Sequence, residues 1–319
     1  MEPGTIGASP AATAAWLAGA KASAAAESAR RYLETVVRRY GGPVPCGLPI
    51  SVFERAWVVG GLLRAGIRVA VPPEVTDDLA RAYGSTGTWA GPGLPADADT
   101  TSAALYALYA MRSPGRRIPP DSLWPYRVPT HFCTWQGEQG FSVSVNAHVL
   151  EAFGEYLAGN PDNHSRYTAE VNALSALLAD RQDDAGCWND RWHASPYYAT
   201  ACCALALARY GVGAPAAAAV RLAARWALDT QREDGSWGLW QGTAEETAYA
   251  LQIVLAVAPE DVHRCRRAVG RGYAYLLGED LERPGPAMWH DKDLYHPASV
   301  VGSAIIASLH LAARALFQP

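Results

Sequence analysis

Lysine is almost missing from this 319-residue sequence, which contains only Lys21 and Lys292. The formal net charge is −4, so the composition gives no reason to expect a nucleic-acid partner. No two cysteines form a C-x-x-C pair, which in a large chain indicates a reduced, cytoplasmic protein and not a disulfide scaffold. The six positions are Cys46, Cys133, Cys187, Cys202, Cys203 and Cys265.

Signals for export, for a membrane span and for a sheet are missing as well. Residues 1–31 are rich in small side chains but lack a basic segment followed by an apolar core, so we expect no signal peptide. No stretch reaches about 18 uninterrupted apolar residues, so we expect no transmembrane segment. Alternating β-branched runs with hairpin signals do not occur, so we expect no sheet.

The sequence is instead rich in hydrophobic and large aromatic residues. Half of it is hydrophobic, and it contains 11 Trp and 15 Tyr but only 5 Phe. Aromatic side chains of this kind either fill a core or line an apolar cavity.

Glycine-containing turns that end in an aromatic residue recur along the chain. Successive copies are 47 to 52 residues apart, and they end at Trp89, Phe141, Trp188, Trp237 and Trp289. Two copies are nearly identical, Q-x-x-x-G-x-W over 182–188 and again over 231–237. A fixed period of this length is typical of helical repeat architectures.

Between the turns, apolar stretches rich in small residues alternate with amphipathic, Arg-bearing stretches, which predicts pairs of helices. Six apolar inner stretches begin near Ser51, Asp99, Ser142, Pro196, Thr243 and Pro297. Outer partners are expected near 12–39, 74–84, 115–125, 165–181, 214–230 and 261–278, and the third has the weakest pattern. Inner stretches that are apolar on most faces must be enclosed, so a closed ring is favoured over an open solenoid. We therefore predict one all-α domain over residues 1–319, an (α/α)6 barrel of about twelve helices around a central cavity.

The segment Asp97-Ala98-Asp99-Thr100-Thr101 directly precedes one of these inner stretches. Asp and Thr are ordinary N-cap residues, but two carboxylates and two hydroxyls exceed what capping requires. Paired acids at the rim of a cavity can differ widely in pKa, which leaves one of them protonated at neutral pH. A neutral carboxylic acid shielded from water is the group that protonation of an alkene requires.

This D-x-D-T-T segment resembles the acid motif of class II, protonation-initiated terpene cyclases, and the Q-x-x-x-G-x-W turns resemble the QW repeats of that superfamily, which includes the squalene–hopene cyclases. Further stretches are similar to its bacterial members of diterpene and drimenyl diphosphate synthase type. They are SPAATAAWL (9–17), FERAW (53–57), SVSVNAHVLEAF (142–153), DRWHASPYYAT (190–200), QREDGSWG (231–238), TAEETAYAL (243–251) and WHDKDLYHP (289–297).

The resemblance implies that Asp99 donates the proton and that Asp97 and Thr100 orient and polarise it. Asn146 and His148 lie on the next inner stretch, so we expect one of them to hydrogen-bond the acid or to return its proton through water. His148 is alternatively an ordinary buried histidine. The resemblance also implies a cyclisation that retains the diphosphate, since the D-D-x-x-D signature of class I enzymes is missing.

Aromatic faces can stabilise the carbocations of such a reaction. The candidates are Trp135, Trp192, Tyr197, Tyr198, Tyr249 and Trp289, although a single aromatic residue of this kind is more often part of the core. Lys292 is the first candidate to anchor the diphosphate and Arg191 the second, where the family often has lysine. Magnesium is expected only through the substrate diphosphate. Glu245 and Glu246 could support it indirectly, although an acid pair in the first turn of a helix is also common.

Class II diterpene cyclases usually carry a second, inserted helical domain, which often supplies an E-D-x-x-D-like magnesium motif. We find neither in this sequence. Three possibilities follow: a partner completes the site, the barrel works alone on a more open site, or the chain is a remnant without turnover. We favour the first, as a separate chain resembling that domain or as self-association. The expected substrate is geranylgeranyl diphosphate, slightly ahead of farnesyl diphosphate, giving a labdane- or drimane-type product.

Three other functions remain open. Protein prenyltransferase β-subunits share the predicted barrel, but we find no suitable Asp, Cys and His set for their zinc. Glycosidases with the same barrel use two separated carboxylates in a polar groove. The third alternative is a non-catalytic or partner-dependent subunit of a split cyclase.

Overall fold

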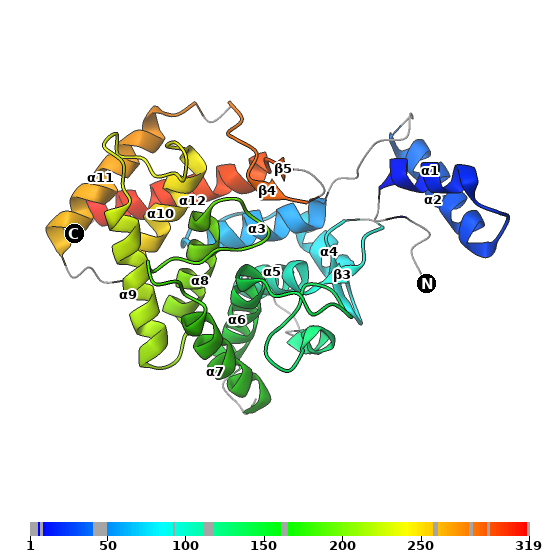
Figure 1. Ribbon diagram of the computed structural model, residues 1–319, viewed down its shortest axis with the longest axis horizontal. Coiled ribbons are helices and arrows are strands. Elements are labelled where there is room, and N and C mark those ends of the chain that lie inside the picture. The colour runs from blue at the N-terminus through cyan, green and yellow to red at the C-terminus, as the bar shows by residue number, and fades with distance from the viewer. Residues whose placement is uncertain are drawn as a thin grey trace.

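The computed structural model describes residue 6 and residues 9–40, 50–91, 93–111, 118–160, 165–257, 261–280, 283–291 and 294–317. Its inner ring consists of α3 (Ser51–Arg64), α5 (Ala98–Ala110), α6 (Val143–Ala158), α8 (Pro196–Tyr210), α10 (Ala244–Leu255) and α12 (Ala298–Phe317). Each of these helices packs against the next, and α12 packs against α3, which closes the ring (Figure 1). All six begin within one residue of the predicted positions, so the predicted all-α barrel is confirmed.

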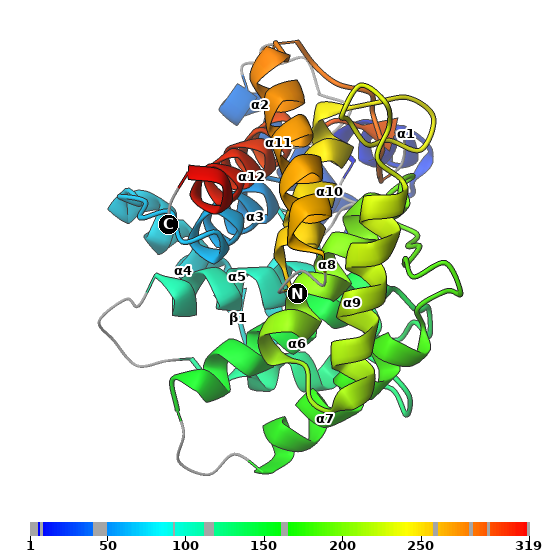
Figure 2. The ribbon, with the colours of Figure 1, turned by 90° about the vertical axis from the view of Figure 1, so that its left-hand side faces the viewer.

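Four outer helices have the predicted places, α4 (Pro73–Ala82), α7 (Ser165–Asp180), α9 (Ala214–Asp229) and α11 (Val262–Gly278). Figure 2 shows α9 and α11 lying over α8 and α10. The amphipathic pattern of these stretches explains the position, because their apolar face packs on the inner ring while their Arg-bearing face meets solvent.

The other two outer partners differ from the prediction. The stretch expected near 115–125 forms a short 3-10 helix, η1 (Pro120–Tyr126), because Pro119, Pro120 and Pro125 do not allow a regular α-helix there. The stretch expected over 12–39 is two helices, α1 (Pro10–Gly19) and α2 (Ala24–Tyr40), because the Ser23 hydroxyl accepts from the Ala26 N–H and starts a new helix. These two helices pack on each other at one side of the ring (Figure 1).

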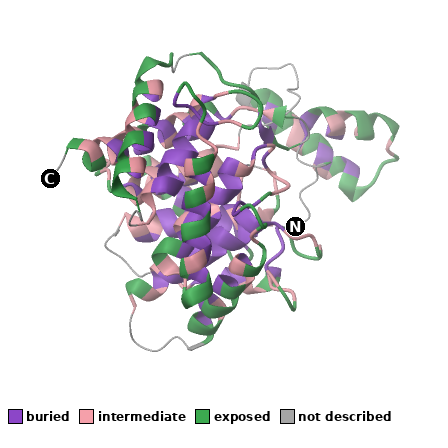
Figure 3. Ribbon diagram, turned by 60° about the vertical axis from the view of Figure 1, so that its left-hand side comes forward, coloured by how far each residue is buried: buried purple, intermediate pink, exposed green. Residues whose placement is uncertain are grey.

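The core lies within the ring and between its two layers. Nearly every residue of α6 and α10 is buried, including Ser144, Asn146, Glu245 and Glu246. Figure 3 shows the buried residues concentrated in the inner helices and the exposed ones on the outer faces. Polar side chains at the beginnings of inner helices are therefore held in a largely apolar interior, where each needs a defined partner.

The two Q-x-x-x-G-x-W turns have the same set of contacts. The Gln182 amide donates to the carbonyls of Gly186 and Ala219, and the Trp188 indole donates to Leu178 O at 2.8 Å. In the second copy, Gln231 donates to Gly235 and Ala268, and Trp237 donates to Ala227 O. Each turn thereby fastens the end of one outer helix to the next outer helix.

Short strands occur where none were expected. Strands β1 (Tyr83–Gly84), β2 (Gly87–Trp89) and β3 (Ala96–Asp97) form an antiparallel sheet that pairs Thr88 with Asp97, and β4 (Trp289–His290) pairs with β5 (Leu294–Tyr295). The expectation of no sheet is wrong in this detail. Strands of two or three residues are too short for the alternating pattern by which strands are recognised.

Helix α12 is the single described helix that is long and apolar enough to cross a membrane by length and composition. In the structure it is the sixth inner helix, packed against α3, α10 and α11.

Candidate active site

Asp97 ends β3 and caps α5. Its carboxylate accepts a hydrogen bond from the Thr100 N–H at 2.6 Å, and the Thr101 hydroxyl donates to its carbonyl. Thr100, which was expected to polarise the acid at position 99, therefore contacts Asp97 instead. Because Asp97 satisfies the helix end, Asp99 is not needed as a cap and its side chain extends towards α6.

Asp99 meets His148 across the boundary between α5 and α6. Asp99 Oδ1 lies 2.7 Å from His148 Nδ1, and the two side chains are 13% and 7% exposed. The other carboxylate oxygen, Oδ2, has no hydrogen-bond partner among the described residues. The pair is thus enclosed by protein, yet one oxygen atom of Asp99 remains available to a substrate.

The acids and the histidine are electrostatically linked. Burial is the largest single influence and disfavours a charged imidazole, but the charge and hydrogen bond of Asp99 together with those of Cys202 outweigh it and raise the pKa of His148 well above its usual value. Burial raises the pKa of Asp97 to about 7, against the opposing effect of the Thr100 N–H, and the charge of Asp99 adds to the rise. The site therefore holds protons that ordinary exposed groups would release at neutral pH.

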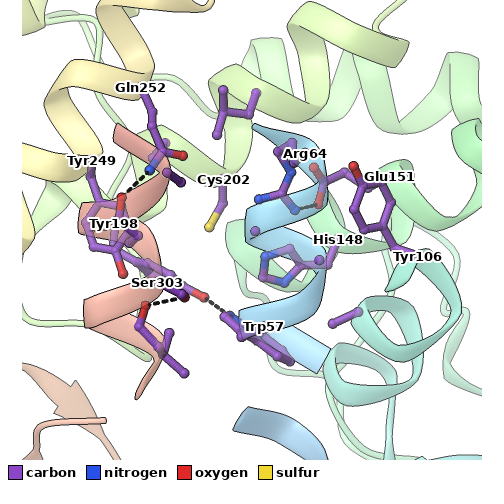
Figure 4. Close-up of a pocket in the computed structure, with 18 of the residues that line it drawn as sticks. Trp57, Arg64, Tyr106, His148, Glu151, Tyr198, Cys202, Tyr249, Gln252 and Ser303 are labelled. Atoms are coloured by element: carbon purple, nitrogen blue, oxygen red, sulfur yellow. Dashed lines mark hydrogen bonds and ion pairs between the residues drawn. The ribbon is translucent and has the colours of Figure 1, made fainter. Parts of the chain in front are cut away.

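A cavity of about 60 Å³ lies beside His148, within the ring and near the middle of the inner helices. All six inner helices contribute to its wall, and Figure 4 shows Trp57, His148, Tyr198 and Tyr249 around it. The Trp57 indole donates to the Tyr198 hydroxyl at 3.1 Å and lies edge-on to His148. Trp57 was not singled out from the sequence, although it lies in the FERAW stretch.

Three of the aromatic candidates, Tyr198, Tyr249 and Trp289, gather around His193. The Trp289 ring centroid lies 4.5 Å from that of Tyr198 and 5.4 Å from that of His193. Tyr198 and Tyr249 line the cavity. This arrangement offers several ring faces close to the Asp99–His148 pair.

Tyr197 does not belong to this group. Its ring packs on Trp226 of outer helix α9, with centroids 4.6 Å apart, and it does not line the cavity. Its position differs from that of Tyr198 because neighbouring residues of a helix point about 100° apart, and of the two only Tyr198 lines the cavity.

Asn146 fixes the backbone that precedes α6. Its side chain accepts from the Phe132 N–H at 2.9 Å and donates to Phe132 O and Ser142 O. Threonines occupy the matching place in three other repeats, where Thr101, Thr200 and Thr247 accept from the N–H of Thr88, Trp188 and Trp237. Of the two residues expected to hydrogen-bond the acid, only His148 does so.

Trp135, Arg191 and Trp192 lie together in an open surface groove, which also contains Glu138 and His290. The Arg191 guanidinium is paired with Glu138 at 3.0 Å and stacks on Trp192. Lys292 lies outside the described residues. Among the described residues of the groove, the Arg191 guanidinium lies next to two aromatic rings, and Glu138 already partly neutralises its charge.

No group of three or more His, Cys, Asp or Glu side chains that could hold a metal ion lies together in the described parts of the chain. Glu246 is occupied by the Ser195 and Thr243 hydroxyls and the Leu239 N–H. Glu245 accepts from the Trp289 indole at 2.7 Å and lies 3.2 Å from His193 Nε2. These contacts do not fit a direct magnesium site at the acid pair.

Comparison with known proteins agrees with this geometry. Residues 139–297 match the squalene-hopene cyclase C-terminal domain. An ent-copalyl diphosphate synthase from Streptomyces sp. (strain KO-3988) is 45% identical over 96% of this chain and 58% of its own length. This chain belongs to the squalene–hopene cyclase superfamily.

Other members of the superfamily support the assignment. A labda-7,13-dienyl diphosphate synthase from Streptomyces clavuligerus is 42% identical over 98% of this chain and 56% of its own length. The solved ent-copalyl diphosphate synthase from Streptomyces platensis is 47% identical with a TM-score of 0.83, over 97% of this chain and 59% of that one. A type II terpene cyclase from Scytonema, 18% identical with a TM-score of 0.63 over 83% of this chain and 88% of that one, shares the fold. The chain therefore spans less than two thirds of the length of its closely similar relatives.

Proposed function

We propose that this chain is the acid-bearing barrel of a class II diterpene cyclase. Asp99 protonates the terminal alkene of geranylgeranyl diphosphate. The resulting carbocation reacts with further double bonds of the same molecule, which closes two rings and gives a labdane-type diphosphate. The observation that carries the proposal is the Asp99–His148 contact at 2.7 Å, which leaves Asp99 Oδ2 free at the end of a closed apolar ring. The diterpene-forming relatives favour the C20 substrate over farnesyl diphosphate and a drimane product.

His148 keeps the acid loaded. With water present, the raised pKa of His148 favours an imidazolium–carboxylate pair. A bound prenyl chain excludes water from the exposed side of Asp99, and loss of solvation disfavours the separated charges. The proton then moves to Asp99, which delivers it to the alkene carbon.

The aromatic rings stabilise positive charge as it moves along the chain. Trp57, Tyr198 and Trp289 lie close to one another beside the acid pair. A desolvated aromatic face contributes roughly 0.5–2 kcal/mol to the stability of a nearby cation. Three such faces would supply a useful part of the barrier reduction without forming any bond.

The prenyl chain binds outside the cavity beside His148. That cavity is about 60 Å³, whereas pockets for ligands of this size usually measure roughly 300–1,000 Å³. The prenyl substrate therefore lies across the N-terminal ends of the inner helices, next to Asp99. A second helical domain, in the same protein or in a partner chain, would cover it there.

The diphosphate stays intact and is held at the groove of Arg191 and, we propose, by Lys292. Magnesium would arrive with the diphosphate, and it supplies charge neutralisation when bound. Glu245 and Glu246, which were considered as indirect support for it, already accept hydrogen bonds from protein groups. The work of this chain is to orient the alkene, exclude water and hold the proton at Asp99.

Product analysis tests the proposal. Purified protein is incubated with geranylgeranyl and farnesyl diphosphates, and the dephosphorylated products are identified by mass spectrometry. The expected result is a bicyclic alcohol from the C20 substrate that vanishes in Asp99→Ala. A product that persists in Asp99→Ala would show that another acid acts, and no product from wild-type protein with both substrates would favour the non-catalytic alternative.

A further inference from the structure

The groove of Arg191 is formed mainly by two segments that backbone hydrogen bonds join into one body. The Ala194 N–H donates to Met288 O at 2.8 Å, and the His290 N–H donates to Trp192 O at 2.9 Å. Strands β4 and β5 pair with each other and complete this body. We call it the groove unit, and it consists of residues 190–194, 288–291 and 294–295.

Glu245 of α10 meets three side chains at the base of the groove unit. Its Oε1 atom accepts from the Trp289 indole at 2.7 Å and lies 3.2 Å from His193 Nε2. Its Oε2 atom lies 4.0 Å from His296 Nδ1, and both of these atoms are buried without a hydrogen-bond partner in the described chain. Trp289 begins the hairpin of β4 and β5, and His296 directly follows it. One carboxylate thus faces both ends of the hairpin and the segment paired with it.

These contacts are shielded from water. The Glu245 side chain is 2% exposed, and the side chain of His193 is fully buried, as is nearly all of Trp289. Hydrogen bonds to a carboxylate are strong, and they are stronger still where no water competes for the groups. A buried indole or imidazole that lost this partner would remain unsatisfied unless it moved. Glu245 therefore holds the hairpin and the His193 segment in one place against α10.

A second attachment joins the other segment of the groove unit to α6. Asp190 accepts from the Val143 N–H at 3.0 Å and from the Ser144 hydroxyl at 2.7 Å. Two attachment points on different helices fix the orientation of a rigid body, whereas a single point leaves it free to pivot. Without Glu245, the hairpin side of the groove unit would therefore shift relative to the ring, while the backbone bonds within the unit persist.

The spacing between the groove unit and Asp99 has a chemical consequence. The diphosphate and the terminal alkene lie at opposite ends of the substrate, and farnesyl diphosphate is one isoprenoid unit shorter than geranylgeranyl diphosphate. With the diphosphate in the groove, a fixed spacing presents only one chain length correctly to Asp99. Misplacing a reacting group by about 1 Å can cost roughly 100-fold in rate, so a rigid spacing separates the two substrates clearly.

We propose that Glu245 is a positioning residue that sets the spacing between the diphosphate groove and Asp99, and thereby the chain length of the prenyl diphosphate that is cyclised. The inference rests on the proposed function, which places the diphosphate in the groove and the alkene at Asp99. Glu245 itself touches neither the substrate nor the reacting atoms. It acts through Trp289 and His193, which carry the groove unit.

Four variants test the proposal. Glu245→Ala removes the attachment, Glu245→Asp keeps the charge but shortens the side chain by one methylene, and Glu245→Gln keeps an oxygen atom for the Trp289 indole. Glu246→Ala is the matched control, because Glu246 is equally buried but accepts from Ser195, Thr243 and Leu239 and not from the hairpin. The measured quantity is the ratio of kcat/KM for geranylgeranyl diphosphate to kcat/KM for farnesyl diphosphate.

Wild-type protein should favour the C20 substrate by roughly 100-fold. The ratio should fall at least about tenfold in Glu245→Ala and at least about threefold in Glu245→Asp, and stay within about twofold in Glu245→Gln and Glu246→Ala. A residue that only supports the fold lowers both constants together and leaves the ratio unchanged. An unchanged ratio in Glu245→Ala and Glu245→Asp, or a wild-type protein that uses both substrates equally, would overturn the proposal.

Two measurements need no turnover. The affinity for inorganic diphosphate, measured by calorimetry, should stay within about twofold in Glu245→Ala, because the groove itself remains intact. A crystal structure of this variant, or of Glu245→Asp, should show the groove unit displaced from α10 with its internal backbone bonds retained. A groove unit that stays in place would refute the role of Glu245. Wild-type protein that cyclises neither substrate would instead refute the proposed function.

Discussion

Two acids occupy the same place in two repeats of the ring, and only one of them is available for chemistry. Asp99 and Glu245 are each the second residue of an inner helix, in α5 and α10. Each lies next to a histidine of a neighbouring repeat, Asp99 at 2.7 Å from His148 and Glu245 at 3.2 Å from His193. By helix position and partner type, the two sites look alike.

Their surroundings separate them. The Glu245 side chain is 2% exposed, and the Trp289 indole donates to it at 2.7 Å and covers it. One oxygen atom of each acid has no hydrogen-bond partner in the described chain, but Glu245 Oε2 is buried from solvent, whereas the Asp99 side chain is 13% exposed. An acid can protonate a substrate only if the substrate can reach it. The comparison teaches that access, not position in the repeat, assigns the role.

Neutralising the two acids one at a time gives the largest expected contrast. Asp99→Asn should lower the cyclisation rate by at least about 1,000-fold, because it removes the proton itself. Glu245→Gln keeps the hydrogen bond from Trp289 and should lower the rate less than about 10-fold. Rates are compared at equal concentrations of folded protein. Similar losses in the two variants would mean that Glu245 shares the chemistry.

The two histidines should differ in the same way as the two acids, with His148 important for catalysis and His193 for stability. His148→Asn should lower kcat about 100-fold, since the acid loses the group that keeps it loaded. His193→Asn should instead lower the free energy of unfolding by about 1–3 kcal/mol, because it leaves buried Glu245 with one partner fewer. Steady-state kinetics and urea denaturation of both variants measure the two effects. A catalytic loss in His193→Asn without a loss of stability would contradict this division.

Asp97 offers an effect of another kind, which appears in the pH dependence of stability. The folded protein holds the Asp97 proton up to about pH 7, whereas the ordinary pKa is 3.8. The folded state therefore binds more protons than the unfolded state between these values, and stability falls as the pH rises from about 4 to 7. Asp97→Asn preserves an N-cap acceptor and removes this titration.

Urea denaturation of wild-type protein and Asp97→Asn should therefore give curves of stability against pH that diverge from pH 4 upwards. The variant should gain relative stability up to about pH 7 and then keep a constant difference. Curves that stay parallel across this range would show that Asp97 titrates normally in the folded protein.

Much of the ring could be predicted because its signals are local. Apolar stretches and their capping residues placed all six inner helices within one residue. The Q-x-x-x-G-x-W turns were recognisable because Gly186 and Gly235 adopt positive φ angles of 97° and 92°, which few other residues tolerate. The prediction was wrong at 12–39 and 115–125, where Ser23 and a group of prolines interrupt the helices.

The site could be predicted only in part. Asp99 and His148 were both named, and the structure brings them together across 49 residues of sequence. Asn146 and Tyr197 have equally suitable side chains, but they face a turn and an outer helix instead. Trp57 and His193 were not singled out, because each gains its importance only from neighbours on other helices.

The sequence by itself determined the number of inner helices, the place where each of them begins, and the acid segment at the start of α5. These features depend on residues within a few positions of one another, where backbone geometry and capping act directly. Only the tertiary structure decided which acid stays accessible and which histidine meets it. Those outcomes depend on how far each helix is rotated about its axis when the ring closes, and on which aromatic side chain then covers its first turn.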